Sequence, residues 1–153
     1  AVGGLRHLQV TRMRYNPPMT TPSIVFLCVH NAGRSQMAAG WARHLGGDRI
    51  AVFSGGSDPA AVTNPSAVAA MAEAGIDIEE AVPQRWSDDD LREADVVVTM
   101  GCGDECPFFP GVRYEDWPIT DPAGLSPVDV APIRDEIRDR VADLLARLGI
   151  EPG

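Results

Sequence analysis

The stretch FLCVHNAGRSQM, residues 26–37, holds the closest grouping of residue types that could do chemistry. An apolar run ends on Cys28, a segment of small residues follows, and Arg34 and Ser35 then stand side by side. A cysteine thiolate is a nucleophile, and an arginine guanidinium offers two parallel donors to an oxyanion. Small residues let backbone N–H groups turn toward such an anion. The pattern therefore predicts a tetrahedral oxyanion bound over Cys28 and open to attack by its sulfur.

Each residue of this loop has an expected part. Arg34 binds the anion together with inward-facing backbone amides, and the first turn of the helix that follows adds partial positive charge. Ser35 is placed to hydrogen-bond the thiolate, and Asn31 tolerates a left-handed backbone and is expected to brace the loop. The side chain of His30 is expected to point away. The predicted substrate-binding residues are consecutive: Val29, His30, Asn31, Ala32, Gly33, Arg34 and Ser35. The competing interpretation is a buried structural cysteine beside a surface arginine.

Buried strands and amphipathic helices alternate around this loop. Short apolar runs predict strands, and four-residue spacing of apolar side chains predicts helices. The predicted strands cover residues 23–28, 50–54 and 95–100, and the predicted helices begin at Arg34, after Asn64, after Ser87 and after Ser126. Alternating strands and helices favour a parallel sheet covered on both faces, with ligands beyond the carboxyl ends of the strands. Cys28 ends the first of these strands, so the loop after it lies where a ligand is expected.

The pattern also suggests how the chain is divided. Residues 1–22 contain three prolines and no sustained period, and we expect a flexible N-terminal extension there. No linker or repeat interrupts the remainder, so residues 23–153 are expected to form a single domain.

Composition narrows the function classes. The formal net charge of −9 disfavours binding to nucleic acid or to an anionic membrane surface. No apolar stretch reaches the roughly 20 residues that span a bilayer, and no signal-peptide core opens the chain, so we expect a cytoplasmic monomer. Three cysteines do not resemble the disulfide framework of a secreted domain.

The other two cysteines, Cys102 and Cys106, follow the strand predicted at 95–100. They are close enough in sequence to form one turn, and three roles are open: redox thiols, metal ligands or inert loop residues. His7, His30 and His44 lack ligand spacing with them, so no metal is predicted.

Three segments resemble a known family: CVHNAGRS, VVVTMGCGDECP and YEDWPITDPAG. They are similar to low-molecular-weight protein tyrosine phosphatases and to the arsenate reductases built on the same fold. The continuation SQMAAGW resembles the reductases, since the phosphatases usually carry proline directly after the serine. The resemblance covers most of residues 23–150. It implies an α/β three-layer sandwich with a central four-stranded parallel sheet and helices on both faces.

The resemblance implies a thioredoxin-coupled arsenate reductase without a cofactor. In that scheme Cys28 attacks arsenate, Asp121 protonates the departing oxygen, and Cys102 and then Cys106 resolve the adduct. Phosphate and sulfate would compete for the loop, and weak phosphatase activity is expected. On its own residues, Asp121-Pro122 is also a common turn. The cysteine pair is more closely spaced than in the better-known reductases, and Gly101 precedes Cys102, which leaves the order of attack open.

Three alternatives remain at this point. The chain could be a phosphomonoesterase of the tyrosine phosphatase type, because the same loop binds phosphate. It could be an arsenate reductase that depends on mycothiol or glutathione, although an internal thiol pair favours thioredoxin. It could also be an oxyanion-binding or thiol-sensing module, which would need Cys28 and Arg34 but not Asp121.

Overall fold

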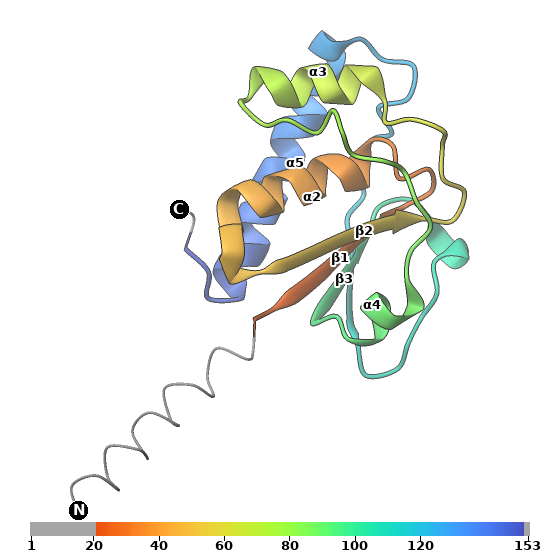
Figure 1. The fold of residues 1–153 in the computed structure, drawn as a ribbon, viewed down its shortest axis with the longest axis vertical. Coiled ribbons are helices and arrows are strands. Elements are labelled where there is room, and N and C mark those ends of the chain that lie inside the picture. The colour runs from red at the N-terminus through yellow and green to blue at the C-terminus, as the bar shows by residue number, and fades with distance from the viewer. Residues whose placement is uncertain (1–20, 152–153) are drawn as a thin grey trace, which may run out of the picture.

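The computed structural model describes residues 21–151, in which strands and helices alternate along the chain (Figure 1). The strands are β1 (Ser23–Cys28), β2 (Ala51–Gly56), β3 (Val96–Thr99) and β4 (Arg113–Asp116). The helices are α2 (Arg34–Gly46), α3 (Pro65–Glu73), α4 (Asp88–Arg92) and α5 (Pro127–Arg147), with short 3-10 turns η2 (Gly47–Arg49) and η3 (Gly103–Glu105). The predicted N-terminal extension lies outside the described residues except for positions 21 and 22.

The strands of the described chain form one parallel four-stranded sheet in the order β2-β1-β3-β4. The three-layer α/β architecture is therefore confirmed. β1 lies at the centre and pairs with both β2 and β3. The register sets Cys28 opposite Gly56 and Leu27 opposite Thr99, so the carboxyl ends of these strands reach the same edge.

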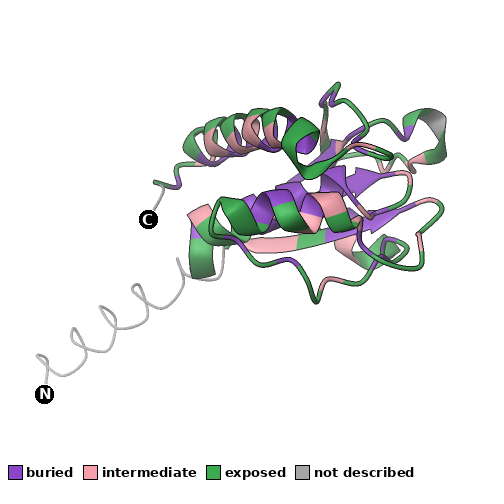
Figure 2. Cartoon of the chain, turned by 90° about the horizontal axis from the view of Figure 1, so that it is seen from above, coloured by how far each residue is buried: buried purple, intermediate pink, exposed green. Residues whose placement is uncertain are grey.

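Two apolar cores fill the two faces of the sheet, because successive strand side chains point in opposite directions. Ile24 and Phe26 of β1 pack with α2, α3 and α5 on one face. Val25 and Leu27 pack with Leu91 of α4 on the other. Figure 2 shows the buried residues gathered along the sheet and on the inward sides of the helices.

The second strand runs further than predicted. The sequence interpretation ended it at Ser54, because two glycines follow, whereas β2 continues through Gly55 and Gly56. A Cβ atom on Gly55 would lie 2.5 Å from the backbone N and Cα of Trp86. Glycine is required here by the close approach of another backbone, so it does not mark the end of the strand.

The fourth strand has no clear signal of its own. The residues RYED of β4 are polar and mostly exposed or half-buried, as suits an edge strand. These residues form a strand because they pair with β3, since their local sequence does not favour one.

The helix starts are confirmed at the caps. Asn64 accepts hydrogen bonds from the backbone N–H groups of Ser66 and Ala67, at 2.9 and 3.4 Å. Ser87 and Ser126 cap α4 and α5 in the same way. Over residues 21–151, the structure contains no helix long and apolar enough to cross a membrane.

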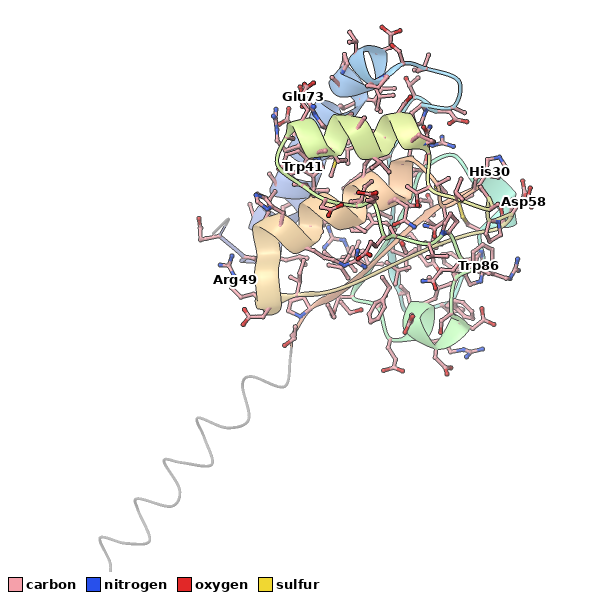
Figure 3. All side chains as sticks on the ribbon, turned by 45° about the horizontal axis from the view of Figure 1, so that its top comes forward. His30, Trp41, Arg49, Asp58, Glu73 and Trp86 are labelled. Carbon is pink, nitrogen blue, oxygen red and sulfur yellow. A yellow bond between two sulfur atoms is a disulfide. The ribbon has the colours of Figure 1, made fainter. Side chains whose placement is uncertain are left out.

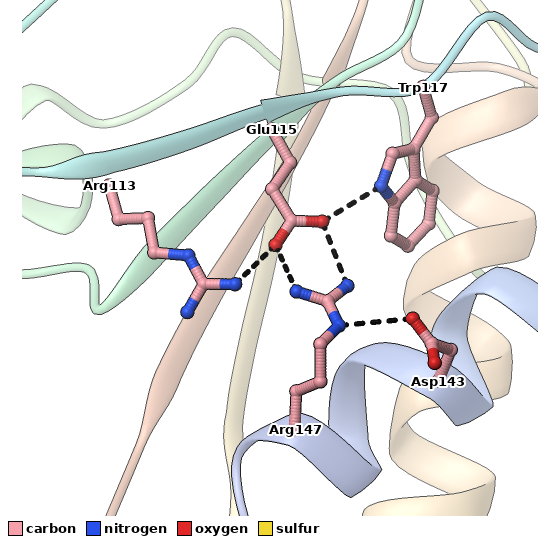
Figure 4. Close-up of polar contacts among 5 residues, drawn as sticks. All are labelled: Arg113, Glu115, Trp117, Asp143 and Arg147. Carbon is pink, nitrogen blue, oxygen red and sulfur yellow. Dashed lines mark hydrogen bonds and ion pairs between the residues drawn. The ribbon is translucent and has the colours of Figure 1, made fainter.

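A carboxylate cluster fastens the edge strand to α5 (Figure 4). Glu115 accepts two hydrogen bonds from Arg147, at 2.6 and 3.1 Å, and one each from Arg113 at 2.6 Å and Trp117 at 3.1 Å. Its side chain is 17% exposed. The hydrogen bonds from Arg147 lead in lowering the pKa of Glu115 to about 2, and burial opposes them.

This cluster predicts acid-sensitive stability. The folded pKa lies below the ordinary value of 4.5, so the stabilisation is complete above about pH 5 and is lost as pH falls toward 2. At pH 7, we expect Glu115→Gln to be less stable than wild type by at most about 3 kcal/mol of unfolding free energy. Between pH 7 and pH 3, the unfolding free energy of the variant should fall less than that of wild type. Urea unfolding at pH 7 and pH 3 measures both.

The matched control is Glu136→Gln on α5. Glu136 pairs with Arg140 at 3.2 Å in a half-exposed position, where an ion pair contributes little. Equal acid sensitivity of wild type and Glu115→Gln would contradict the assignment.

Candidate active site

The candidate site lies at the carboxyl edge of the sheet. Cys28, the last residue of β1, is 2% exposed. Beside it, the N–H of Met100 donates to Leu27 O at 2.8 Å, and the N–H of Trp117 donates to Thr99 O at 2.8 Å. These bonds extend the sheet ladder past the ends of β3 and β4. The segments that leave three adjacent strands therefore begin next to one another.

The loop after Cys28 turns its carbonyl groups to one side. The carbonyls of Val29, His30 and Ala32 accept hydrogen bonds from backbone N–H groups of residues 58–64, at 2.8 to 3.0 Å. In a trans peptide the N–H lies opposite the carbonyl, and the described residues contain no cis peptide bond. The N–H group after each of these carbonyls therefore points away from residues 58–64, as an anion-binding loop requires.

A buried chain of hydrogen bonds leads to the thiol. The N–H of Gln84 donates to Asn31 Oδ1 at 3.0 Å, which orients the amide so that Nδ2 donates to Ser35 Oγ at 2.7 Å. Ser35 Oγ lies 2.9 Å from Cys28 Sγ. In this last hydrogen bond either atom can be the donor.

Asn31 also has an unusual backbone. Its φ is +50°, and it is the one non-glycine residue with positive φ in the part of the chain that the structure describes. Asparagine tolerates this left-handed conformation better than most residues do. Its side chain is buried and hydrogen-bonded to Ser35, Gln36 and Gln84, which is the arrangement that a bracing role requires.

Arg34, the first residue of α2, is 9% exposed. Its Nη1 donates to the carbonyl of Ile119 at 3.3 Å, and its Nη2 lies 3.8 Å from Asp121 Oδ2. The carboxylate is half-exposed, at 54%. The guanidinium is thus held by the segment that follows β4 while it faces the loop after β1.

The Asp-Pro segment closes over the loop. Asp121 Oδ1 accepts a hydrogen bond from the N–H of Ala123 at 3.0 Å, which forms a local turn. A Cβ atom on Gly33 would lie 2.7 Å from Pro122 Cγ, so glycine permits this contact. Asn64, at the start of α3, also holds this segment, because its Nδ2 donates to the carbonyl of Pro122 at 3.5 Å.

A small cavity of about 50 Å³ lies between these segments. Its walls come from the thiol loop, the start of α3 and the Asp-Pro segment: Cys28, His30, Ala32, Gly33, Arg34, Asn64, Asp121, Pro122 and Ala123. The cavity brings together three predicted residues that are far apart in sequence, Cys28, Arg34 and Asp121. A larger groove of about 640 Å³ runs beside α5, but no cysteine is among the residues that line it.

The residues that line the cavity differ from the predicted site residues: some predicted residues do not line it, and some lining residues are not in the predicted set. Five predicted residues are not among those that line it: Val29, Asn31, Ser35, Cys102 and Cys106. Asn64, Pro122 and Ala123 line the cavity and are not in the predicted set. The sequence marked Asn64 only as a helix cap, and nothing local distinguished Ala123.

His30 is among the residues that line the cavity, but its imidazole bonds to the neighbouring Asp58 segment. Its imidazole Nδ1 lies 2.9 Å from the carbonyl oxygen of Asp58, and its side chain is 52% exposed. Figure 3 shows His30 and Asp58 next to each other at the rim of the molecule.

The other two cysteines form a disulfide directly after β3. The Cα atoms of Cys102 and Cys106 lie 5.7 Å apart across η3. Cys102 is 3% exposed and Cys106 is half-buried, whereas Cys28 is a free thiol. No cluster of three or more potential metal ligands occurs among the residues described.

A parallel α/β sheet with a thiol, a guanidinium and a carboxylate around one small cavity defines a class of cysteine-containing oxyanion-loop proteins. The chain belongs to the low molecular weight phosphotyrosine protein phosphatase family, whose model matches residues 23–152.

Relatives within this family carry a common name. The chain is 38% identical over 133 residues to arsenate reductase 2 of Staphylococcus epidermidis, covering 84% of this chain and all of the relative. It is 41% identical over 133 residues to the arsenate reductase of Bacillus licheniformis, covering 80% and 94%.

Solved structures agree with this placement. A thioredoxin-dependent arsenate reductase of Corynebacterium glutamicum superposes with a TM-score of 0.72 at 38% identity, over 84% of this chain and 62% of that one. An arsenate reductase in a phosphate-binding state gives a TM-score of 0.70 at 36% identity, over 82% and 98%.

The bracing by Asn31 can be tested by two substitutions. Asn31→Gly removes the amide but accepts the backbone conformation, whereas Asn31→Ala removes the amide and adds strain. We expect the glycine variant to lose about 1–3 kcal/mol of unfolding free energy, because buried partners lose their hydrogen bonds. The alanine variant should lose roughly 1 kcal/mol more. Urea unfolding measures both, and a glycine variant as stable as wild type would show that the amide braces nothing.

Proposed function

We propose that this protein is an arsenate reductase that uses Cys28 as its nucleophile. The single observation that carries the proposal is the cavity that joins Cys28, Arg34 and Asp121. The names of the relatives supply the substrate, because several proteins at 38 to 41% identity are arsenate reductases.

Binding and attack are assigned to the thiol loop. Arsenate is held by the guanidinium of Arg34 and by the N–H groups that the outward carbonyls leave directed into the loop. Ser35 Oγ, 2.9 Å from Cys28 Sγ, is assigned to hydrogen-bond the attacking sulfur. The thiolate attacks arsenic and forms a sulfur–arsenic bond, and one arsenate oxygen leaves.

Asp121 is assigned as the general acid. Its carboxyl lines the cavity, and its position beside Arg34 Nη2 places it next to the guanidinium that binds the anion. When protonated, it gives its proton to the departing oxygen, which then leaves as water. Its half-exposed position lets it regain a proton from solvent.

Electrons then pass through the cysteines. The Cys102 thiolate attacks Cys28 Sγ, and the electron pair of the sulfur–arsenic bond goes to arsenic, which leaves as arsenite. The Cys106 thiolate next attacks Cys102 Sγ, forms the Cys102–Cys106 disulfide and releases Cys28 as a thiolate. The two electrons that reduce arsenic balance the one disulfide formed. A bond between Cys102 and Cys106 beside a free Cys28 is the arrangement expected at the end of this sequence.

The reductant is proposed to be thioredoxin, which would attack Cys106. Cys102 is 3% exposed, so Cys106 is the sulfur that an outside thiolate can reach. Cys106 lines an open cavity of about 380 Å³ together with Phe108, whose side chain is 71% exposed. An apolar rim of this kind suits a protein dithiol better than a small polar thiol such as glutathione or mycothiol. One structural neighbour is named as thioredoxin-dependent.

The same proposal covers the setting of the enzyme. A disulfide reduced on each turnover suits the cytoplasm, where thiols are kept reduced. We propose that residues 23–153 act as one domain and as a monomer, with phosphate and sulfate as competing anions. Weak aryl phosphatase activity is expected as well, because the family model is that of a phosphatase.

The division of labour among the cysteines is the main test. Cys28→Ser should abolish both arsenate reduction and aryl phosphatase activity, because both reactions need the nucleophile. Cys102→Ser and Cys106→Ser should abolish only thioredoxin-coupled reduction. Arsenite release and aryl phosphate hydrolysis are measured side by side, so the phosphatase reaction controls for folding. Full thioredoxin-coupled turnover in either of the last two variants would rule out the relay.

The acid is tested separately. Asp121→Asn should slow formation of the Cys28 adduct by about 10²–10⁴-fold, because a general acid acts in the transition state. Phosphate affinity should change little. Rapid-quench kinetics and phosphate inhibition give the two quantities. Weakened phosphate binding with an unchanged chemical step would instead make Asp121 a turn residue.

A further inference from the structure

Gly101 touches the arginine of the site. It lies between β3 and Cys102 and has a φ of +87°. A Cβ atom built on it would overlap Arg34 Nη1, and would lie 3.1 Å from Arg34 Cζ and 3.3 Å from Nη2. The missing side chain therefore leaves the space that the guanidinium occupies.

Among the described glycines with positive φ, Gly101 alone is crowded. The described chain holds other glycines with positive φ, and a Cβ on any of them would meet no atom within 4 Å: Gly47, Gly75, Gly103, Gly111, Gly124 and Gly149. At those positions glycine serves the backbone conformation alone. At Gly101, glycine permits both the positive φ and the close approach of the Arg34 guanidinium.

We infer that Gly101 is a positioning residue for Arg34. Arg34 Nη1 donates to the Ile119 carbonyl at 3.3 Å, and the same atom occupies the space that a side chain on Gly101 would need. Arg34 is 9% exposed, so the guanidinium has little room to move aside. A methyl group at position 101 would displace the Arg34 guanidinium from its alignment with the backbone amides of the loop. Two parallel hydrogen bonds to an oxyanion depend on that alignment.

The contact also joins the two halves of the site. Gly101 directly precedes Cys102, which carries the buried sulfur of the disulfide. Arg34 also lies 3.8 Å from Asp121. The guanidinium therefore lies between the segment that carries the cysteine pair and the segment that carries the proposed acid. The inference rests on the proposed function only in taking Arg34 as the anion-binding group.

Inorganic phosphate is the probe, and Gly75→Ala is the matched control. Gly75 has a φ of +86°, nearly the same as Gly101, but open space around it. Both alanine variants carry the same backbone strain, and only Gly101→Ala meets the guanidinium. We expect Gly101→Ala to weaken phosphate binding by about tenfold or more, as loss of one good charge-assisted contact would. Gly75→Ala should stay within about twofold of wild type. Calorimetric titration of the full chain measures both.

A second comparison uses stability. The midpoint of urea unfolding should fall further for Gly101→Ala than for Gly75→Ala, and the extra fall should vanish when Arg34→Ala removes the guanidinium. If Gly101→Ala does not fold, the double variant should fold. A double variant that also fails to fold, or an extra fall that persists in it, would overturn the inference.

Unchanged phosphate affinity in Gly101→Ala would overturn it as well. Failure of the premise that the loop with Arg34 binds oxyanions looks different, because the wild type would then bind no phosphate at all. The urea comparison would still decide whether Gly101 positions Arg34.

Discussion

The site depends on the hydrogen bonds that hold the carbonyls of the thiol loop against residues 58–64. Because three carbonyls point to that side, the N–H groups that follow them point to the other, and the loop becomes a set of donors. Asn31 supports this arrangement with a left-handed backbone and a buried amide, and its amide also orients Ser35 toward the sulfur. A thiol at the end of a buried strand thus gains a polar environment that the apolar sheet around it could not supply.

The parallel sheet adds the remaining groups by bringing strand ends together. β1 delivers Cys28, β3 delivers the disulfide pair, and β4 leads into the segment with Asp121. Arg34 connects these parts, since it bonds to the segment after β4 and lies against Gly101 after β3. The family is named for phosphatases. In the proposed function, the two thiols after β3 are what would allow a bound oxyanion to be reduced as well as attacked.

Much of this could be predicted from the sequence, because the signals were local. The strand that ends at Cys28, the loop of small residues and the cap at Asn64 each follow from short-range chemistry. The extent of β2 and the existence of β4 depend on contacts with other segments, namely the approach of Trp86 to Gly55 and the pairing with β3. The place of Asn64 in the cavity and the contact of Gly101 with Arg34 arise only when distant loops meet, so no local pattern reveals them.

The central claim is that the protein itself supplies both electrons to arsenic. The most direct measurement is a single turnover of fully reduced protein with arsenate and no other reductant, followed by alkylation and mass analysis of the cysteines. The account predicts one arsenite released per chain, a Cys102–Cys106 disulfide and an alkylatable Cys28. Arsenite that appears only after an external thiol is added, or a final disulfide that contains Cys28, would contradict it.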